Sequence, residues 1–349
     1  MNPYQLSEQH LPFLTRMAAL ACRFLGVNRL FYFLNRKRKR ILAYHNVLPD
    51  AHFRNRLHEG VSHSESVFRE QITHLTRRFK IGLDIDDPNQ LTLSFDDGYR
   101  NQHAVAHPIL MQFGIKAYFF CTLELVSDAK TLLIDEFMCW LSYAKAGCYR
   151  IELPNGTPPL TLIVQNDNDR LACWKLLYPH ILADYPTVAP ALYAELDRCQ
   201  PFSEIKQQID ATYRTLRFDP ILPHALLTMK AYGHLVGAHG KTHAPLGCLA
   251  KPALEEELKT CESEIGNTFN TGVFCFPFGG LKETTSDVRR FGFSHAFANI
   301  NVPLPKTQSY HDFMIPRLAL PNSANPAEMD FILSGTKYFL KHRCLLPKW

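Results

Sequence analysis

Short apolar runs alternate with amphipathic stretches along most of the chain. The apolar runs have the length and composition of buried strands, and they cover residues 41–44, 91–95, 115–122, 235–238, 273–276 and 295–299. The stretches between them place apolar residues three and four positions apart, which predicts helices over residues 68–79, 102–113, 223–232, 252–265 and 288–291. Strands that alternate with helices form parallel βα units, so we expect an α/β fold with a helix-covered sheet or barrel.

One internal region departs from this alternation. Residues 151–153 and 160–164 flank Asn155-Gly156, which resembles a hairpin signal although the loop is longer than two residues. Helical patterns fill residues 170–215. We therefore expect a mixed α/β insertion at about 125–220 within a core of residues 41–325, followed by a C-terminal tail, 326–349.

The N-terminal segment combines apolar and basic residues. Apolar residues recur at helical spacing over residues 11–34 with arginines between them, and the basic run 36–40 follows at once. An N-terminal amphipathic basic helix is therefore predicted within residues 1–40. Two interpretations stay open, a helix packed on the domain with a solvated basic run, or an anchor at a membrane surface. No nucleic-acid module accompanies the run, so we expect no nucleic-acid partner.

Composition narrows the class of protein. A chain of 349 residues with 46% hydrophobic content can bury a large core, and a net charge of +5 does not by itself imply a polyanionic partner. The ten cysteines form no CxxC pair and lie mostly in apolar runs, as Cys121 and Cys275 do, which favours reduced thiols. With no secretory signal pattern at residues 1–34, we expect a cytoplasmic protein, with peripheral inner-membrane contact through residues 11–40 as an open alternative.

Polar groups follow three of the predicted strands, at the sheet edge where parallel α/β proteins build their sites. Asp96-Asp97-Gly98 ends the strand that begins at Leu91. Two adjacent carboxylates need a positive partner, and a divalent metal would satisfy one while the other acts as a base. Alone, this segment also fits an Asx-type turn.

The other two segments are histidine-rich and glycine-rich. His239 and His243 follow the strand 235–238, and two imidazoles with one carboxylate leave open coordination positions, as catalytic metal sites do. Phe276-Pro277-Phe278-Gly279 ends the strand 273–276, and its turn can expose N–H groups to an oxyanion. Taken singly, these segments equally fit two loop histidines and an ordinary turn.

Together, in this order, the three segments resemble the motifs of the polysaccharide deacetylase family, the NodB-like carbohydrate esterases. The resemblance spans roughly residues 41–320 without the insertion. It implies a distorted (β/α) barrel of the NodB type in which Asp97, His239 and His243 bind the metal. Zinc is the default for such a ligand set, with cobalt, nickel or manganese as alternatives. Asp96 would be the general base, and the N–H of Phe278 would hold the oxyanion.

Two further residues are assigned through the same resemblance. His45, in Ala43-Tyr44-His45, is similar to the N-terminal histidine of the poly-N-acetylglucosamine deacetylases and would be the general acid, although it also fits a structural strand cap. Arg317 lies in a late Pro-Arg segment and would pair with Asp96 or with a surface carboxylate. The chain departs from the family where Gly240 replaces Ser or Thr, Phe278 replaces Tyr, and the usual Arg before Pro277 is missing.

The expected function is therefore hydrolysis of the N-acetyl group of an amino sugar in a polysaccharide, or in a lipid-linked or nucleotide-linked glycan precursor. Two alternatives stay open. A glycan-binding protein on the same fold would show a broken ligand set. A non-haem iron oxygenase would share the two histidines and one carboxylate, but it needs no adjacent Asp96-Asp97 pair.

Overall fold

The computed structural model describes residues 11–53, 62–87, 89–154, 156–279, 285–299 and 313–342. Within these ranges, nine strands form one sheet in which every adjacent pair is parallel. The strands are β1 (Arg40–Tyr44), β4 (Lys80–Ile81), β5 (Gln90–Phe95), β6 (Tyr118–Cys121), β9 (Leu235–Ala238), β10 (Val273–Cys275), β11 (His295–Ala298), β12 (Ile315–Pro316) and β13 (Leu318–Ala319). Their order is β12-β11-β10-β9-β6-β5-β1-β13, and β4 adds to β5.

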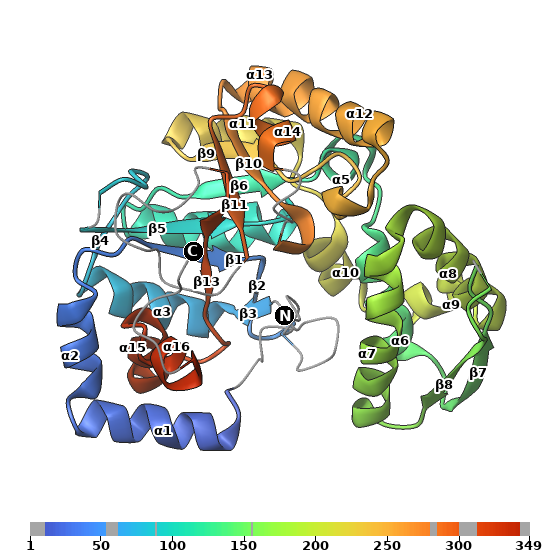
Figure 1. Cartoon of the computed structure of the whole chain (residues 1–349), viewed down its shortest axis with the longest axis horizontal. Helices are drawn as coiled ribbons and strands as arrows, with labels where there is room; N and C mark the ends of the chain where they lie inside the picture. The colour runs from blue at the N-terminus through green and yellow to red at the C-terminus, as the bar shows by residue number, and fades with distance from the viewer. Residues whose placement is uncertain are drawn as a thin grey trace.

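The two ends of this order adjoin along the chain, so the sheet forms a nearly closed barrel (Figure 1). β12 pairs with β11 and β13 pairs with β1, yet only Arg317 separates β12 from β13 along the chain. Because these closing strands have two residues each, the barrel is distorted at this seam. The (β/α) barrel expected from the sequence is confirmed, and the seam carries one of the predicted site residues.

Helices cover the outside of the barrel. They are α3 (Glu65–Thr76), α4 (His107–Gln112), α5 (Leu123–Asp128), α11 (Pro223–Tyr232), α12 (Lys251–Cys261), α13 (Asn267–Phe269) and α14 (Thr285–Arg290). The π-helical turns Gln102–Ala106 and Glu262–Gly266 adjoin α4 and α12. A small parallel pair, β2 (Asn46–Leu48) and β3 (Ser62–Ser64), lies beside the barrel.

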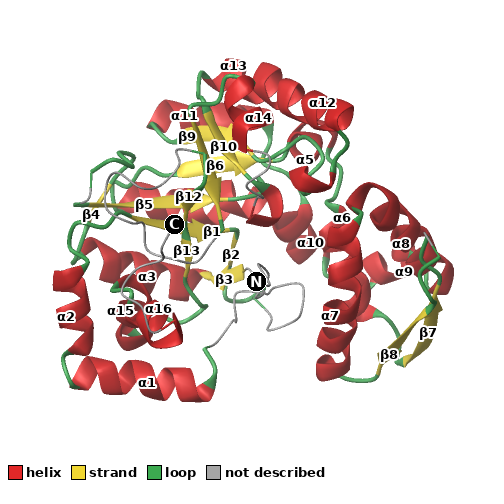
Figure 2. Ribbon diagram, viewed as in Figure 1, coloured by secondary structure: helices red, strands yellow, loops and turns green. Residues whose placement is uncertain are grey.

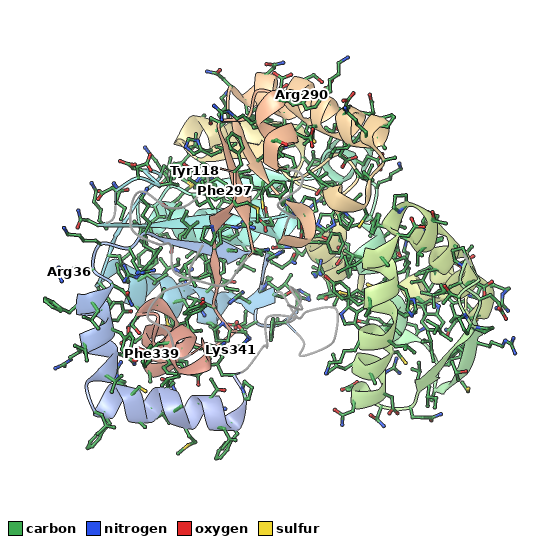
Figure 3. The ribbon with its side chains drawn as sticks, viewed as in Figure 1. Arg36, Tyr118, Arg290, Phe297, Phe339 and Lys341 are labelled. Atoms are coloured by element: carbon green, nitrogen blue, oxygen red, sulfur yellow. The ribbon has the colours of Figure 1, made fainter. Side chains whose placement is uncertain are left out.

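Alternation along each strand divides the core into two layers. One set of residues, such as Phe95 and Phe119, packs with the outer helices. The opposite set forms a smaller cluster, in which the rings of Tyr118 and Phe297 lie 5.4 Å apart between centroids (Figure 3). Since the period is two residues, Asp96 points to the side opposite to Phe95, as Ser94 does.

Residues 133–218 form a separate helical lobe, where the sequence predicted an insertion (Figures 1 and 2). It consists of α6 (Leu133–Tyr143), the antiparallel hairpin β7 (Gly147–Ile151) and β8 (Leu160–Val164), α7 (Asp167–Ala183), α8 (Tyr185–Cys199), α9 (Phe202–Gln207) and α10 (Ala211–Phe218). Within the lobe, Arg217 and Asp135 form a buried ion pair that is 2.9 Å long. The hydroxyl of Tyr99, a residue of the barrel, donates a hydrogen bond to the same carboxylate and so joins the lobe to the barrel. Tyr99 directly follows the Asp96-Asp97-Gly98 segment.

The two ends of the described chain pack together. The single helix predicted over residues 11–34 is instead two helices, α1 (Phe13–Phe24) and α2 (Val27–Leu34), which turn at Gly26 in a left-handed conformation with φ 72°. Residues 326–342, expected as part of a tail, form α15 (Pro326–Leu333) and α16 (Thr336–His342), and α15 is buried against α1 (Figure 1).

The sequence predicted a solvated basic run at residues 36–40. This prediction is wrong for the last three residues of the run. Arg38, Lys39 and Arg40 are buried. The guanidinium of Arg40 donates to backbone carbonyls of Leu333, Arg38 and Asn35, and Lys39 lies 2.5 Å from Asp86. These cations satisfy carbonyl groups and a carboxylate of the fold itself, so only Arg36 and Lys37 of the run are exposed.

No single helix in the described ranges has the length and apolar character needed to cross a bilayer. α1 and α2 pass that test only as a pair, and the pair is bent by 80°.

Candidate metal and catalytic site

The predicted metal ligands come together at the carboxyl ends of β5 and β9. The Oδ1 atom of Asp97 lies 3.4 Å from Nε2 of His239 and 3.3 Å from Nε2 of His243. All three residues are buried, and their ligand atoms lie within 4.8 Å of one another. The spacing and the donor types fit a divalent cation bound by two imidazoles and one carboxylate.

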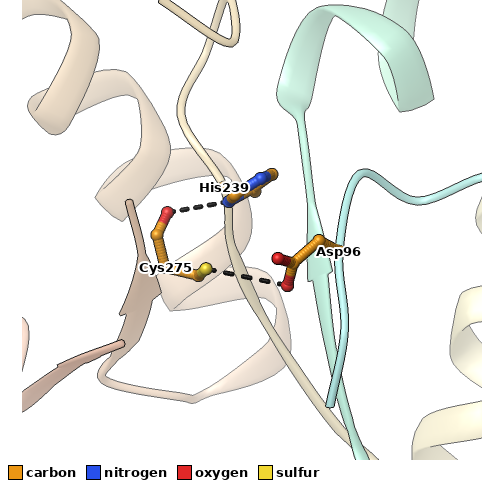
Figure 4. Close-up of side chains that lie close together, drawn as sticks. All are labelled: Asp96, His239 and Cys275. Atoms are coloured by element: carbon orange, nitrogen blue, oxygen red, sulfur yellow. Dashed lines mark hydrogen bonds between the residues drawn. The ribbon is translucent and has the colours of Figure 1, made fainter. Parts of the chain in front are cut away.

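The orientation of His239 also fits a ligand. Its Nδ1 lies 2.8 Å from the backbone carbonyl of Cys275 on β10, so the ring donates there (Figure 4). Its Nε2 lies 3.4 Å from Oδ1 of Asp97. Metal-binding histidines commonly donate their second ring N–H to a carbonyl in this way. Burial lowers the pKa of His239, but interactions with Cys275, Asp96 and Asp97 outweigh this and raise it well above its usual value. The groups around His239 therefore favour a positive charge there, and a metal cation bound to its Nε2 would provide that charge.

The loop between the two histidines is braced by Glu257 of α12. Its carboxylate accepts hydrogen bonds from the backbone N–H groups of Lys241, at 2.7 Å, and Thr242, at 2.8 Å. The hydroxyl of Thr242 lies 3.1 Å and 3.2 Å from the two carboxylate oxygens. Thr242 and Glu257 thus brace this loop, which contains Gly240. The sequence contains no local signal for Glu257, because it lies on another element.

The backbone at the site is strained at residues other than glycine. Among the described residues, five non-glycine positions have positive φ, and three of them are Asp97 (78°), His243 (63°) and Phe278 (57°). Residues other than glycine rarely adopt a positive φ. Those that do concentrate at functional sites, where the surrounding contacts hold the backbone in place. The strain therefore marks the same segments as the three sequence motifs.

The second aspartate forms a bidentate pair with Arg317. The two guanidinium nitrogens lie 2.6 Å from Oδ1 and 2.6 Å from Oδ2 of Asp96, and both side chains are fully buried. Of the two partners open for Arg317 in the sequence, the structure therefore selects Asp96. Burial raises the pKa of Asp96, but the charges of Arg317 and His239 outweigh it and lower the pKa to about 2. Asp96 is therefore ionised at neutral pH.

Cys275 completes this charged cluster and was not predicted. Its Sγ lies 2.9 Å from a guanidinium nitrogen of Arg317 and 3.6 Å from Oδ1 of Asp96 (Figure 4). The guanidinium of this cluster comes from the barrel seam, through Arg317, and not from the strand that carries Cys275.

His45 lies beside the same carboxylate. Its Nε2 is 3.6 Å from Oδ2 of Asp96, and the side chain is 21% exposed, which leaves one side open to solvent. Gln102 fixes this geometry, since its amide donates to the backbone carbonyls of both His45 and Asp96. Burial lowers the pKa of His45, although Asp96 and Asp97 act in the opposite direction. The imidazole is therefore mostly neutral at pH 7.

Phe278 lies next to the metal ligands and next to the lobe. Its ring centroid is 5.0 Å from that of His243 and 5.8 Å from that of Tyr185 on α8. The aspartate segment and the histidine loop are joined by residues 122–124. The N–H groups of these residues donate to the carbonyls of Asp97, Gly240 and Lys241. All seven residues predicted for the site therefore lie in one region of the molecule.

The chain matches no protein-family model and no curated protein sequence. Solved structures do resemble it. The Streptococcus pyogenes deacetylase PplD, solved in complex with acetate, is 12% identical, with a TM-score of 0.52 over 85% of this chain and 98% of that one. BC0361, a polysaccharide deacetylase from Bacillus cereus, is 12% identical, with a TM-score of 0.51 over 85% and 68% of the two chains. The chain thus has the fold of the polysaccharide deacetylases. The resemblance carried by its motifs is therefore confirmed for the fold.

Proposed function

We propose that the protein is a metal-dependent hydrolase that cleaves the amide bond of an N-acetylated amino sugar. The observation that carries this proposal is the pairing of two carboxylates with different surroundings. Asp97 faces two imidazoles within 3.4 Å, whereas the adjacent Asp96 is held by Arg317. Environments that separate neighbouring acids in this way are typical of sites where one residue binds and the other transfers protons.

Asp97, His239 and His243 would hold the cation. When bound, a divalent metal supplies Lewis acidity, which polarises a carbonyl oxygen and makes a water molecule more acidic. We propose zinc as the native metal because two imidazoles and one carboxylate are a common zinc ligand set, with cobalt, nickel and manganese as the alternatives to be compared.

Asp96 and His45 would move the protons. Asp96 stays ionised, so its free carboxylate lone pairs can accept a proton from the water that attacks the amide carbon. The imidazole of His45 lies 3.6 Å away, which is close enough to receive that proton after a small movement. The imidazolium can then protonate the amine, whose departure as an anion would be unfavourable. The products are acetate and the free amino sugar.

The backbone N–H of Phe278 would stabilise the oxyanion that forms on the carbonyl. Its strained turn, with φ 57°, positions the residue beside His243. A fixed donor aimed at developing charge needs no rearrangement during the reaction, which is why such donors contribute strongly to catalysis.

We propose a carbohydrate substrate, either a polysaccharide or a lipid-linked or nucleotide-linked glycan precursor. Support comes from the names of the structural neighbours, which are a deacetylase and a polysaccharide deacetylase. The cytoplasmic location expected from the sequence stays a prediction.

Acetate release tests this function. The purified chain, stripped of metal and then supplied with zinc, cobalt, nickel or manganese, is incubated with N-acetylglucosamine oligomers and with membrane glycolipid extracts. We expect release that depends on metal and falls by about 10²- to 10⁴-fold in Asp96→Asn. His239→Ala should lose both metal binding and release, and Lys241→Ala, in the same loop, serves as the control.

Other outcomes would point to other functions. Tight metal binding without release from either pool would favour a glycan-binding role. Turnover that requires iron and oxygen would favour an oxygenase. Failure to bind any of these metals would show that Asp97, His239 and His243 are not metal ligands.

A further inference from the structure

The helix α1 packs on the protein through its small residues and exposes its large apolar residues to solvent. Its small residues Thr15, Ala18, Ala19 and Cys22 face the domain and are buried or half-buried. Its large apolar residues face solvent instead, with exposed fractions of 73% for Phe13, 79% for Leu14 and 91% for Phe24. A surface helix of a soluble domain normally buries its large apolar face, so this orientation needs a physical cause.

Ion pairs with α15 hold the helix in this orientation. Arg16 lies 3.0 Å from Glu328, and Arg23 lies 3.2 Å from Asp330. Both carboxylates belong to buried residues, so rotating α1 to bury its apolar face would leave two buried charges without these partners. The outward face of α1 is therefore a fixed feature of the fold.

The exposed apolar surface continues onto α2. We define the N-terminal patch as the large apolar residues of this region that are at least 45% exposed, which are Phe13, Leu14, Met17, Leu20, Phe24, Leu25, Leu30, Phe33 and Leu34. Contiguous patches of this kind on a soluble protein mark contact with another apolar surface. The bend at Gly26 sets α1 and α2 along two edges of the barrel body (Figure 1).

The charges on the segment that carries the patch have one sign. No acidic residue occurs between Glu8 and Asp50, whereas the same stretch contains eight arginines and lysines. Arg29, Arg36 and Lys37 are exposed beside the apolar residues, and Arg36 lies at the outer edge of the molecule (Figure 3). Protein surfaces usually present both signs of charge, whereas an anionic bilayer presents negative headgroups above an apolar layer.

We infer that α1 and α2 dock the protein on an anionic lipid bilayer, with the N-terminal patch in the acyl–headgroup boundary and the flanking cations on the headgroups. This inference does not depend on the proposed deacetylase activity, because it rests on the orientation of α1, the exposed apolar residues of α2 and the cations beside them. It combines the two interpretations that the sequence left open, since α1 is packed on the domain and also presents an apolar face.

Vesicle flotation tests this docking. The full chain is mixed with vesicles of phosphatidylcholine alone or of phosphatidylcholine with phosphatidylglycerol. We expect the wild type to float with the anionic vesicles, and less at high salt. The double variant Phe13→Asp, Phe24→Asp should bind at least about tenfold more weakly, because it lacks the two rings that the bilayer would bury. Leu227→Asp is the matched control, since Leu227 is a 54% exposed residue on α11, away from the patch.

Two results would overturn the inference. One is absence of wild-type flotation with either vesicle. The other is a wild-type dimer in solution that the double variant converts to a monomer, which would assign the patch to a second copy of the chain. Circular dichroism confirms that the variants are folded. Acetate release from soluble oligomers should be the same in the double variant as in the wild type, so failure of docking and failure of the proposed function are separate outcomes.

Discussion

At the scale of single residues, Arg317 neutralises and orients the buried carboxylate of Asp96. It is fully buried, it binds both oxygens of Asp96, and it also contacts Ser94 and Cys275. A bidentate guanidinium holds a carboxylate in one orientation, which a single ammonium does not. The base of the proposed reaction is therefore positioned from the barrel seam rather than from its own strand.

Replacing Arg317 tests this dependence. In Arg317→Met, Asp96 is left buried without its cation, so we expect the free energy of unfolding to fall by about 3–5 kcal/mol. The value of kcat/KM for acetate release should fall by about 10²-fold or more, because the base loses its orientation. Urea unfolding and kinetics at a temperature where the variant is folded measure the two effects. Arg317→Lys should be intermediate, and a Met variant as stable as the wild type would contradict the argument.

Gly240 gives a second test, because a Ser, which the resembled deacetylase motif carries at this position, should be harmful here. Its φ is +80°, and an added Cβ would lie 3.1 Å from Oε1 of Glu257 and 3.2 Å from Cγ of Pro277. We expect Gly240→Ser to lower the free energy of unfolding by about 1–2 kcal/mol and to weaken metal binding, because the brace from Glu257 must shift.

Gly114→Ala provides the control for this substitution. Gly114 also has a positive φ, +66°, but a Cβ added there would meet no other atom within 4 Å. The variant should therefore lose stability without any change in metal affinity, as measured by calorimetric zinc titration. Equal zinc affinity in Gly240→Ser and the wild type would show that the brace is unimportant.

At the scale of elements, Asp330 of α15 is one of the two carboxylates that hold α1 in place, and it contacts several elements at once. Asp330 interacts with Arg23, Tyr32, His74 and Arg78. Burial raises the pKa of Asp330, but the hydrogen bond from His74 and the charge of Arg78 outweigh it and hold the pKa below its usual value of 3.8. The N-terminal helices are thus attached to the barrel body by an ionised, mostly buried group.

The pH dependence of stability tests this attachment. A carboxyl group with a lowered pKa in the folded state stabilises that state above its unfolded pKa, and it loses this contribution as pH falls through the folded pKa. Asp330→Asn should therefore cost about 1–3 kcal/mol of unfolding free energy at pH 7. The difference from the wild type should shrink below about pH 4. Urea titrations at several pH values measure it, and a difference independent of pH would exclude the ionic explanation.

At the scale of the whole molecule, the barrel brings distant segments into one cluster. Asp97 follows β5 and the two histidines follow β9, with the entire lobe of residues 133–218 between them in the sequence. The unfolded chain cannot hold these ligands together, so a cation should bind the folded state in strong preference. Metal binding is therefore linked to global stability.

Thermal unfolding with and without zinc tests this linkage. At a free zinc concentration of about 100 times the dissociation constant, the folded state should gain about 2.7 kcal/mol, which raises Tm by several degrees. Chelation should reverse the gain, and His243→Ala should abolish it. A zinc-induced rise in Tm that persists in His243→Ala would locate the bound metal elsewhere.

Much of this organisation was readable from local patterns. The strands at 91–95 and 235–238 and the helix at 223–232 follow from apolar periodicity and from bounding turn residues such as Gly233, because these signals lie within a few residues of one another. The alternation of these elements predicts a helix-covered parallel sheet or barrel, and the resemblance of the motifs to those of the deacetylases implies the barrel. The motifs around Asp97 and His239 were visible for the same reason, since each is a short segment at a strand end.

Contacts between distant residues were decided only by the tertiary structure. The pairing of Arg317 with Asp96, the brace from Glu257 and the position of Cys275 each join different elements, so no local pattern specifies them. Periodicity likewise identified α1 as amphipathic but not which face it buries. That choice depends on the buried carboxylates Glu328 and Asp330, about three hundred residues away, whose charges hold the arginines inward and leave the apolar face of the helix to solvent.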